Sequence, residues 1–239
     1  MAQTDKLVGI IGGMGPEATV DFMSRVLAAT PAKTDQDHIR VVVENNPRIP
    51  SRQLAMRGEG VDPGKAIAEI AVRLQSLNAD FIVMPCNLAH AWRRDIESAI
   101  SIPFISIVEE SVRSALERSG DDSAVGLMTT PGCFTAGLYQ QALADAGRPV
   151  ITQAPDELAE TMLLVEQIKA GNKSPRVAAG LQTLADKLLQ RGAKVLIAAC
   201  TEFPLVLDQS MFNVAFVSST DVLAKKTVAL ALGKDPLNN

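Results

Sequence analysis

Val8-Gly9-Ile10-Ile11 and Val125-Gly126-Leu127-Met128 decide the fold class, because each is a short apolar run that leads into a turn rich in Gly, Thr or Pro. Other apolar runs of strand length alternate with segments whose apolar residues recur every three or four positions. The strand-like runs cover residues 6–11, 39–43, 80–84, 124–128 and 193–198, and the helical patterns cover residues 16–29, 64–76, 108–118, 135–146, 159–169 and 175–190. Alternating strands and helices are typical of a parallel sheet, so the sequence predicts an open α/β fold.

The two halves of the chain repeat each other in order and spacing. Val125 follows Val8 at nearly the same interval as Cys200 follows Cys86. The apolar runs that end at these cysteines are also alike, since a small polar residue follows the cysteine in each. Because strands of such folds resemble one another, a chance likeness is the alternative. We expect two related halves, each with a cysteine at the carboxyl end of a strand, where open α/β folds bind their ligands.

The composition is that of a globular protein with a sizeable core. The 239 residues are 47% hydrophobic and 21% charged, which suits one large domain or two small ones. The formal net charge is −4 and Lys and Arg are scattered singly, so nucleic acid is not an expected partner. No apolar run reaches the roughly 18 residues of a membrane span, and no secretion signal is expected. We therefore expect a cytoplasmic protein without membrane contact, whose three cysteines are reduced thiols.

Cys86 and Cys200 are candidate acid and base groups. A cysteine between a buried strand and a helix meets backbone N–H groups and the helix dipole, which are expected to lower the pKa of its thiol. Two such thiols on opposite sides of a cleft would form a device in which one takes a proton and the other gives one. The alternative is a buried small hydrophobe, which is the favoured interpretation for Cys133. With only His38 and His90 to add, and no Cys-x-x-Cys, no metal site is expected.

The first turn, Gly13-Met14-Gly15-Pro16-Glu17-Ala18, fits the dinucleotide-binding pattern G-x-G-x-x-A. Two features oppose that function. No acidic residue stands at the expected distance, and Pro16 lacks a backbone donor where a pyrophosphate would need one. We expect instead that the glycines let backbone N–H groups approach a small carboxylate at the helix N-terminus.

Four motifs cover the chain in order. They are Ile10-Ile11-Gly12-Gly13-Met14-Gly15-Pro16-Glu17-Ala18-Thr19, Asn45-Asn46-Pro47-Arg48-Ile49-Pro50-Ser51-Arg52, Met84-Pro85-Cys86-Asn87-Leu88-Ala89-His90 and Ala199-Cys200-Thr201-Glu202-Phe203-Pro204-Leu205. Together they resemble the aspartate/glutamate racemase family, and its aspartate racemase branch in particular. Cys-Thr-Glu is similar to the aspartate racemase branch, since glutamate racemases usually carry Cys-Thr-His.

The resemblance implies two pseudo-symmetric α/β domains with the active site at their interface, a homodimer, and racemisation of a small amino acid or dicarboxylate without pyridoxal phosphate or another cofactor. The expected domains are 1–104 plus 208–239, whose last helix covers residues 221–232, and 105–207. Cys86 and Cys200 would be the acid/base thiols, and Arg52 and Lys169 would contact substrate carboxylates. The remaining substrate-binding residues would be Met14, Asn87, Leu88, Thr201 and Glu202.

Leu88 departs from the family, which usually has Thr at this position in Cys-Asn-Thr-Ala-His. Loss of that hydroxyl would shift the preferred substrate toward a larger or less acidic side chain. We expect interconversion of L- and D-aspartate or glutamate. The alternatives are another racemase, isomerase or decarboxylase reaction on the same scaffold, a carboxylate binder without catalysis, and a nucleotide-binding oxidoreductase. His90 would either orient the Cys86 loop or be a packed, hydrogen-bonded core residue.

Overall fold

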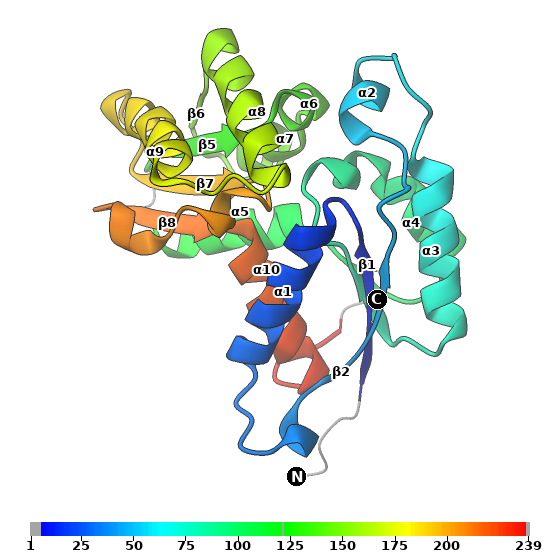
Figure 1. Ribbon diagram of the computed structural model, residues 1–239. Helices are drawn as coiled ribbons and strands as arrows, with labels where there is room; N and C mark the ends of the chain where they lie inside the picture. The colour runs from blue at the N-terminus through cyan, green and yellow to red at the C-terminus, as the bar shows by residue number, and fades with distance from the viewer. Residues whose placement is uncertain (1–5, 121, 238–239) are drawn as a thin grey trace. The chain divides into compact units, whose positions relative to one another are not determined.

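The computed structural model describes residues 6–120 and 122–237 and divides the chain into two compact units (Figure 1). The first comprises Met1–Ile107 and Thr220–Asn239, and the second comprises Val108–Ser219. The chain therefore passes between the units twice, once inside the helix α5 (Ile107–Glu117) and once at the start of α10 (Ser219–Ala231).

The first unit is built on a four-stranded parallel sheet in the order β2-β1-β3-β4. In Figure 1, α3 and α4 cover one face of this sheet, and α1 lies beside α10 on the other. An Arg25–Asp221 ion pair joins α1 to α10. The elements are β1 (Leu7–Gly12), α1 (Pro16–Ala29), η1 (Asp35–Asp37), β2 (Arg40–Asn45), α2 (Arg52–Met56), α3 (Gly64–Ser76), β3 (Phe81–Val83), η2 (Leu88–Trp92), α4 (Arg93–Ala99) and β4 (Phe104–Ile105).

The second unit repeats this topology with the strand order β6-β5-β7-β8, again all parallel. Helices α8 and α9 lie together on one side of the sheet, and α5 lies on the other (Figure 1). The elements are β5 (Val125–Thr129), α6 (Pro131–Ala136), α7 (Leu138–Asp145), β6 (Val150–Thr152), α8 (Pro155–Lys169), α9 (Pro175–Gln190), β7 (Val195–Ala199), η3 (Phe203–Leu205), η4 (Gln209–Met211) and β8 (Ala215–Ser218).

The structure confirms the α/β class, and it also shows the short helices α2 and α4, which were not predicted. The short strands β4, β6 and β8 were not predicted, since each lies at a sheet edge and has at most four residues. The helical pattern at 135–146 is two helices, because Gly137 adopts a positive φ of 67° between α6 and α7. The first unit resumes at Thr220, not at residue 208, because β8 pairs with β7 in the second sheet.

The internal repeat extends to side-chain packing. A Cβ at Gly9 would lie 3.2 Å from side-chain atoms of Leu74, Ala79 and Ile82. A Cβ at Gly126 would meet Leu188, Ala193 and Leu196 at 2.8 to 3.3 Å. The neighbours occupy matching places in the two units. Leu74 and Leu188 lie on the helix before the third strand, Ala79 and Ala193 lie in the loop after that helix, and Ile82 and Leu196 lie on the third strand. Each unit therefore needs a glycine in its first strand so that a helix can pack closely over the sheet.

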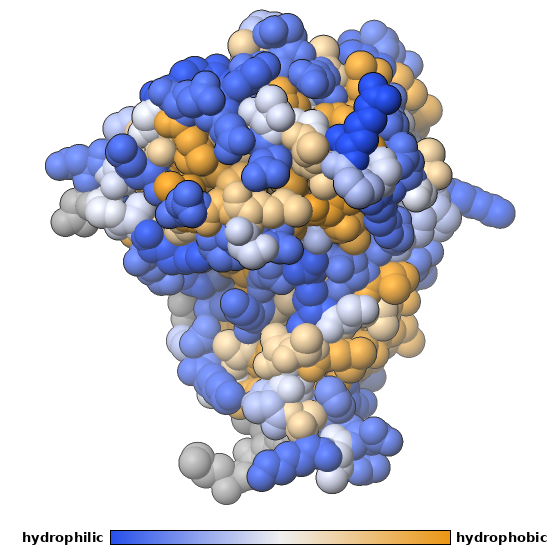
Figure 2. Space-filling view, turned by 60° about the vertical axis from the view of Figure 1, so that its left-hand side comes forward, coloured by the Kyte–Doolittle hydropathy of each residue, from blue (hydrophilic) through white to orange (hydrophobic). Residues whose placement is uncertain are grey.

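Polar and apolar residues share the surface. The face shown in Figure 2 carries separate hydrophobic patches surrounded by hydrophilic residues. Val20 and Leu27 on α1 and Leu163 on α8 are the most exposed large apolar side chains of these helices. Among the described residues, no helix is long and apolar enough to cross a membrane.

Candidate active site

Cys86 lies in a tight turn after the third strand of the first sheet. Strand β3 ends at Val83, and the Cys86 N–H donates a hydrogen bond of 2.8 Å to the Met84 carbonyl. Cys86 is 7% exposed, and the next two residues, Asn87 and Leu88, are also buried. The sequence prediction placed a helix here, and the structure shows the five-residue 3₁₀ segment η2.

His90 fixes the Cys86 turn. Its Nε2 accepts a hydrogen bond of 3.1 Å from the Ile107 N–H, so the ring proton is on Nδ1, which donates to the Cys86 carbonyl at 2.9 Å. Burial lowers the pKa of His90 to about 4, against the opposing effect of the Cys86 carbonyl. The imidazole is therefore neutral at pH 7, with both nitrogens occupied. His90 is at once the packed core residue and the residue that orients the loop.

The glycine-rich turn after β1 is used for close packing. Gly13 has a φ of 97°, and a Cβ there would lie 2.2 Å from the Asn46 carbonyl oxygen. The Gly13 N–H donates to the Thr19 hydroxyl at 2.9 Å, so this backbone donor is already used inside the protein. The Gly13 N–H is therefore not a donor for a substrate carboxylate. Met14 is buried beside it.

Arg52 begins the short helix α2 and is partly buried. Its Nη1 donates to two backbone carbonyls, Ile49 at 3.0 Å and Pro50 at 2.8 Å. Among the described residues it has no carboxylate partner. The two carbonyls hold the guanidinium in place while Nε and Nη2 keep their donors for an external anion.

Cys200 lies after β7 at the position that Cys86 holds after β3, but its thiol contacts a carboxylate. The Cys200 Sγ donates to Glu202 Oε2 at 3.0 Å, and the Thr201 hydroxyl donates to the same oxygen at 3.4 Å. The other oxygen, Oε1, lies 3.5 Å from the Lys169 Nζ at the end of α8. Cys200, Thr201 and Glu202 are all buried. The structure thus brings four predicted site residues of the second unit together.

The thiol of Cys200 is held in its protonated form. Burial and then the Glu202 carboxylate raise the pKa of Cys200 well above its ordinary value, and the Lys169 ammonium only partly opposes them. The expected lowering of this pKa is therefore wrong. The segment that follows, η3, is a three-residue 3₁₀ turn and lacks the dipole of a full helix. The effect of burial on the pKa of Cys200 is therefore larger than any lowering by the backbone of this turn.

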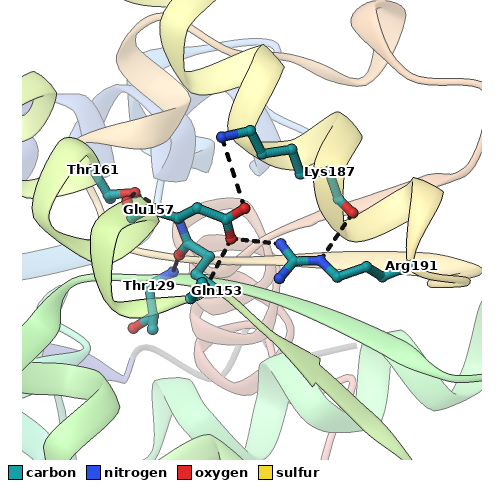
Figure 3. A network of polar contacts seen from close by, with 7 residues as sticks. Thr129, Gln153, Glu157, Thr161, Lys187 and Arg191 are labelled. Atoms are coloured by element: carbon teal, nitrogen blue, oxygen red, sulfur yellow. Dashed lines mark hydrogen bonds and ion pairs between the residues drawn. The ribbon is translucent and has the colours of Figure 1, made fainter.

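Lys169 was predicted to bind substrate, and the structure pairs it with Glu202. Its helix is anchored at the other end by a polar network around the buried Glu157 (Figure 3). Glu157 accepts from the Ala154 N–H at 2.9 Å and from Arg191 at 2.5 Å, and Lys187 lies 3.8 Å away. These contacts keep the pKa of Glu157 below its usual range although burial opposes them. The network fixes α8, whose last residue is Lys169.

Sequence reasoning missed Tyr139, the only tyrosine of the chain. It is fully buried and hydrogen-bonded to Ser111 and Ser219. The Ser219 hydroxyl donates at 2.9 Å to the carbonyl of Ala198, two residues before Cys200. A lone buried tyrosine has no sequence signal beyond its helical spacing. Cys133 is 1% exposed within α6, as expected of a small core residue.

Two α/β units of one topology, each with a buried thiol just beyond its third strand, define a duplicated α/β enzyme scaffold. Among the described residues, no group of three or more His, Cys, Asp or Glu side chains is placed to hold a metal ion. The chain belongs to the Asp/Glu/hydantoin racemase family, whose model matches residues 11–227, and is an amino-acid racemase of that family.

Several relatives are similar over nearly the whole chain. The broad specificity amino-acid racemase RacX of Bacillus subtilis is 32% identical over 232 residues, which are 95% of this chain and 98% of the relative. The structure of Picrophilus torridus aspartate racemase superposes with a TM-score of 0.84 at 29% identity, over 98% of this chain and 96% of that one. An aspartate racemase homologue from Pyrococcus horikoshii shares the fold, with a TM-score of 0.76 at 22% identity over 95% and 99% of the chains.

Proposed function

We propose that the protein interconverts L- and D-aspartate or glutamate without a cofactor, by proton transfer through Cys86 and Cys200. One observation carries this proposal. In the first sheet Ile10 pairs with Val83, and Cys86 follows three residues later. In the second sheet Leu127 pairs with Ile197, and Cys200 follows three residues later. The duplicated fold thus delivers one thiol per unit at the same point beyond equivalent strands.

In the proposed reaction, one cysteine as a thiolate removes the α-proton, so that a C–H bond breaks and an S–H bond forms. The other cysteine gives its thiol proton to the opposite face of the α-carbon, which inverts the configuration. Cys200, hydrogen-bonded to Glu202 as a thiol, is the proton donor of the resting state. Arg52 would bind a substrate carboxylate with its remaining donors and stabilise the negative charge that develops at the α-carbon. Met14, Asn87 and Thr201 would line the pocket.

A broader substrate range is the second candidate, and Leu88 favours it. This residue is buried in the loop that follows Cys86 and brings an apolar side chain to the position of the usual family threonine. The Bacillus subtilis relative, similar over nearly its whole length, is named for broad specificity. The missing hydroxyl would weaken the binding of aspartate more than the binding of a less acidic amino acid.

The test is loss of the α-proton NMR signal when the purified protein is incubated in D₂O with L- or D-aspartate, glutamate and a panel of other amino acids, without added cofactor. Cys86→Ser and Cys200→Ser should each lower the rate by about 100-fold or more, because an acid/base group is lost. Cys133→Ser is the matched control and should keep the parent rate. Racemisation at the parent rate by either of the first two variants would overturn the two-thiol scheme. Binding that stabilises the fold without any washout would favour the carboxylate binder.

We also propose that the protein acts as a homodimer in the cytoplasm. Val20 and Leu27, seven residues apart on α1, are more than half exposed, which suits a contact between copies. Light scattering of the parent should give twice the chain mass, and a Val20→Glu, Leu27→Glu variant should give the monomer. A monomeric parent would contradict this assignment.

A further inference from the structure

We infer that Glu202, with Lys169 beside it, is the route by which Cys200 exchanges its proton with solvent between turnovers. This inference rests on the proposed function and assigns Glu202 to proton transfer, where sequence resemblance placed it among the substrate-binding residues. The carboxylate has one oxygen on the buried thiol and the other on an exposed ammonium.

The geometry supports a path from the interior to the surface. The Cys200 Sγ lies 3.0 Å from Glu202 Oε2, within the reach of direct proton transfer. Glu202 is 4% exposed, and its Oε1 lies 3.5 Å from the Lys169 Nζ. The Lys169 side chain is 42% exposed, so the outer end of the path meets water. The Thr201 hydroxyl, 3.4 Å from Oε2, helps to fix the carboxylate.

A two-thiol racemase needs such a path. Each inversion exchanges the states of the two cysteines, because the one that removed a proton ends as a thiol and the other ends as a thiolate. Before the same enantiomer can react again, a proton must leave one cysteine and another must reach the other. Water supplies and accepts these protons, but it must reach the thiol of Cys200, a residue that is only 8% exposed.

The proposed step is balanced between the thiol and the carboxylate. The S–H bond of Cys200 breaks, its proton bonds to Glu202 Oε2, and a thiolate and a carboxylic acid result. The acid then loses its proton to water, which restores the carboxylate. The Lys169 ammonium, 3.5 Å from Oε1, pairs with the carboxylate that this return restores. The reverse sequence reprotonates the thiolate.

His90, near the other cysteine, is a polar residue that is not part of a proton path. Its Nδ1 donates to the Cys86 carbonyl and its Nε2 accepts from the Ile107 N–H, so the imidazole is committed at both nitrogens to backbone groups. It holds a loop in position and moves no proton. Glu202 differs because its hydrogen-bond donor is the reacting thiol itself.

The test separates kcat from kcat/KM in Glu202→Gln. The glutamine amide keeps the shape and a hydrogen bond to Cys200, but it does not carry a proton. Slow resetting of the unliganded enzyme limits turnover at saturating substrate and not at low substrate, so kcat should fall by about tenfold or more while kcat/KM stays within about twofold. Acetate or formate in the buffer should restore kcat by carrying the proton. Glu166→Gln, an exposed residue on the same helix as Lys169, should leave both constants unchanged.

A fall of kcat/KM in proportion to kcat, without rescue by acetate, would overturn the inference and make Glu202 a substrate-binding or structural residue. If Glu202→Gln does not fold, Lys169→Gln decides the question at the surface. It should lower kcat with kcat/KM kept, whereas a raised KM at unchanged kcat would assign Lys169 to the substrate and overturn its role in the path. Absence of racemisation by the parent would be a failure of the proposed function instead.

Discussion

The loops that carry Cys86 and Cys200 occupy the same place in two copies of one topology, and their surroundings are unlike. Cys86 lies in a turn whose carbonyl is held by a neutral, buried imidazole. Cys200 donates its thiol proton to a carboxylate that is paired with an ammonium. Two residues after each cysteine stand Leu88 in one unit and Glu202 in the other. The repeated backbone positions the thiols, and the side chains that are not repeated give each thiol its own chemistry.

The largest difference expected between the two sites is in stability. His90→Ala removes the hydrogen bonds to the Cys86 carbonyl and the Ile107 N–H and leaves a cavity, so the free energy of unfolding should fall by about 3 kcal/mol or more. Glu202→Gln keeps the shape and hydrogen bonding of the side chain and should lower the free energy of unfolding by less than about 1 kcal/mol. Urea denaturation followed by circular dichroism compares the two variants. Equal losses would show that both sites depend alike on their polar partner.

The pH dependence of stability should report the same contrast. The pKa of His90 is about 4 in the fold, below its ordinary value of 6.5, so the unfolded chain binds this proton more readily. The contribution of neutral His90 is complete above pH 6.5 and is lost as pH falls toward 4, by about 3 kcal/mol in all. Urea midpoints between pH 7 and pH 4.5 measure the loss. His90→Gln should flatten this part of the curve, and an unchanged slope in that variant would refute the assignment.

Glu202→Gln should also change the alkylation rate of Cys200 but not that of Cys86. Because the Glu202 carboxylate raises the pKa of Cys200, Glu202→Gln should lower it and speed alkylation of Cys200 at pH 8 by about tenfold, the effect of one pKa unit. Cys86 is the internal control in the same digest. Mass spectrometry after iodoacetamide treatment gives both rates. A slower or unchanged Cys200 would mean that burial alone keeps the thiol protonated.

The smallest effect is expected at Leu88. Leu88→Thr restores the hydroxyl usual in the family, so kcat/KM for aspartate should rise about fivefold relative to a neutral amino acid of similar size, the worth of one neutral hydrogen bond. Competition between the two substrates in one reaction measures the ratio directly. A ratio that does not move would show that Leu88 does not select the substrate side chain.

The sequence predicted the central strands of each sheet and the edge strand β2, and it missed the other three edge strands, β4, β6 and β8. Buried strands such as β1 and β5 carry continuous apolar runs, whereas β4 and β6 are too short to show a period. The cysteine positions were predictable because a strand end is a local feature. The pairing of Lys169 with Glu202 was not, because it depends on how α8 packs against the β7 loop. Desolvation of Cys200 has the same origin, and it reversed the expected direction of the pKa shift.

The isotope content of the product formed in D₂O, in the first few per cent of conversion, shows whether two different thiols act on one α-carbon. Starting from either enantiomer of a substrate that turns over, we expect product that carries one deuterium at the α-carbon in both directions, because the donor thiol has exchanged with solvent. Product that keeps the substrate's own α-proton would show that a single group removes and returns it, and would rule out the two-thiol reaction.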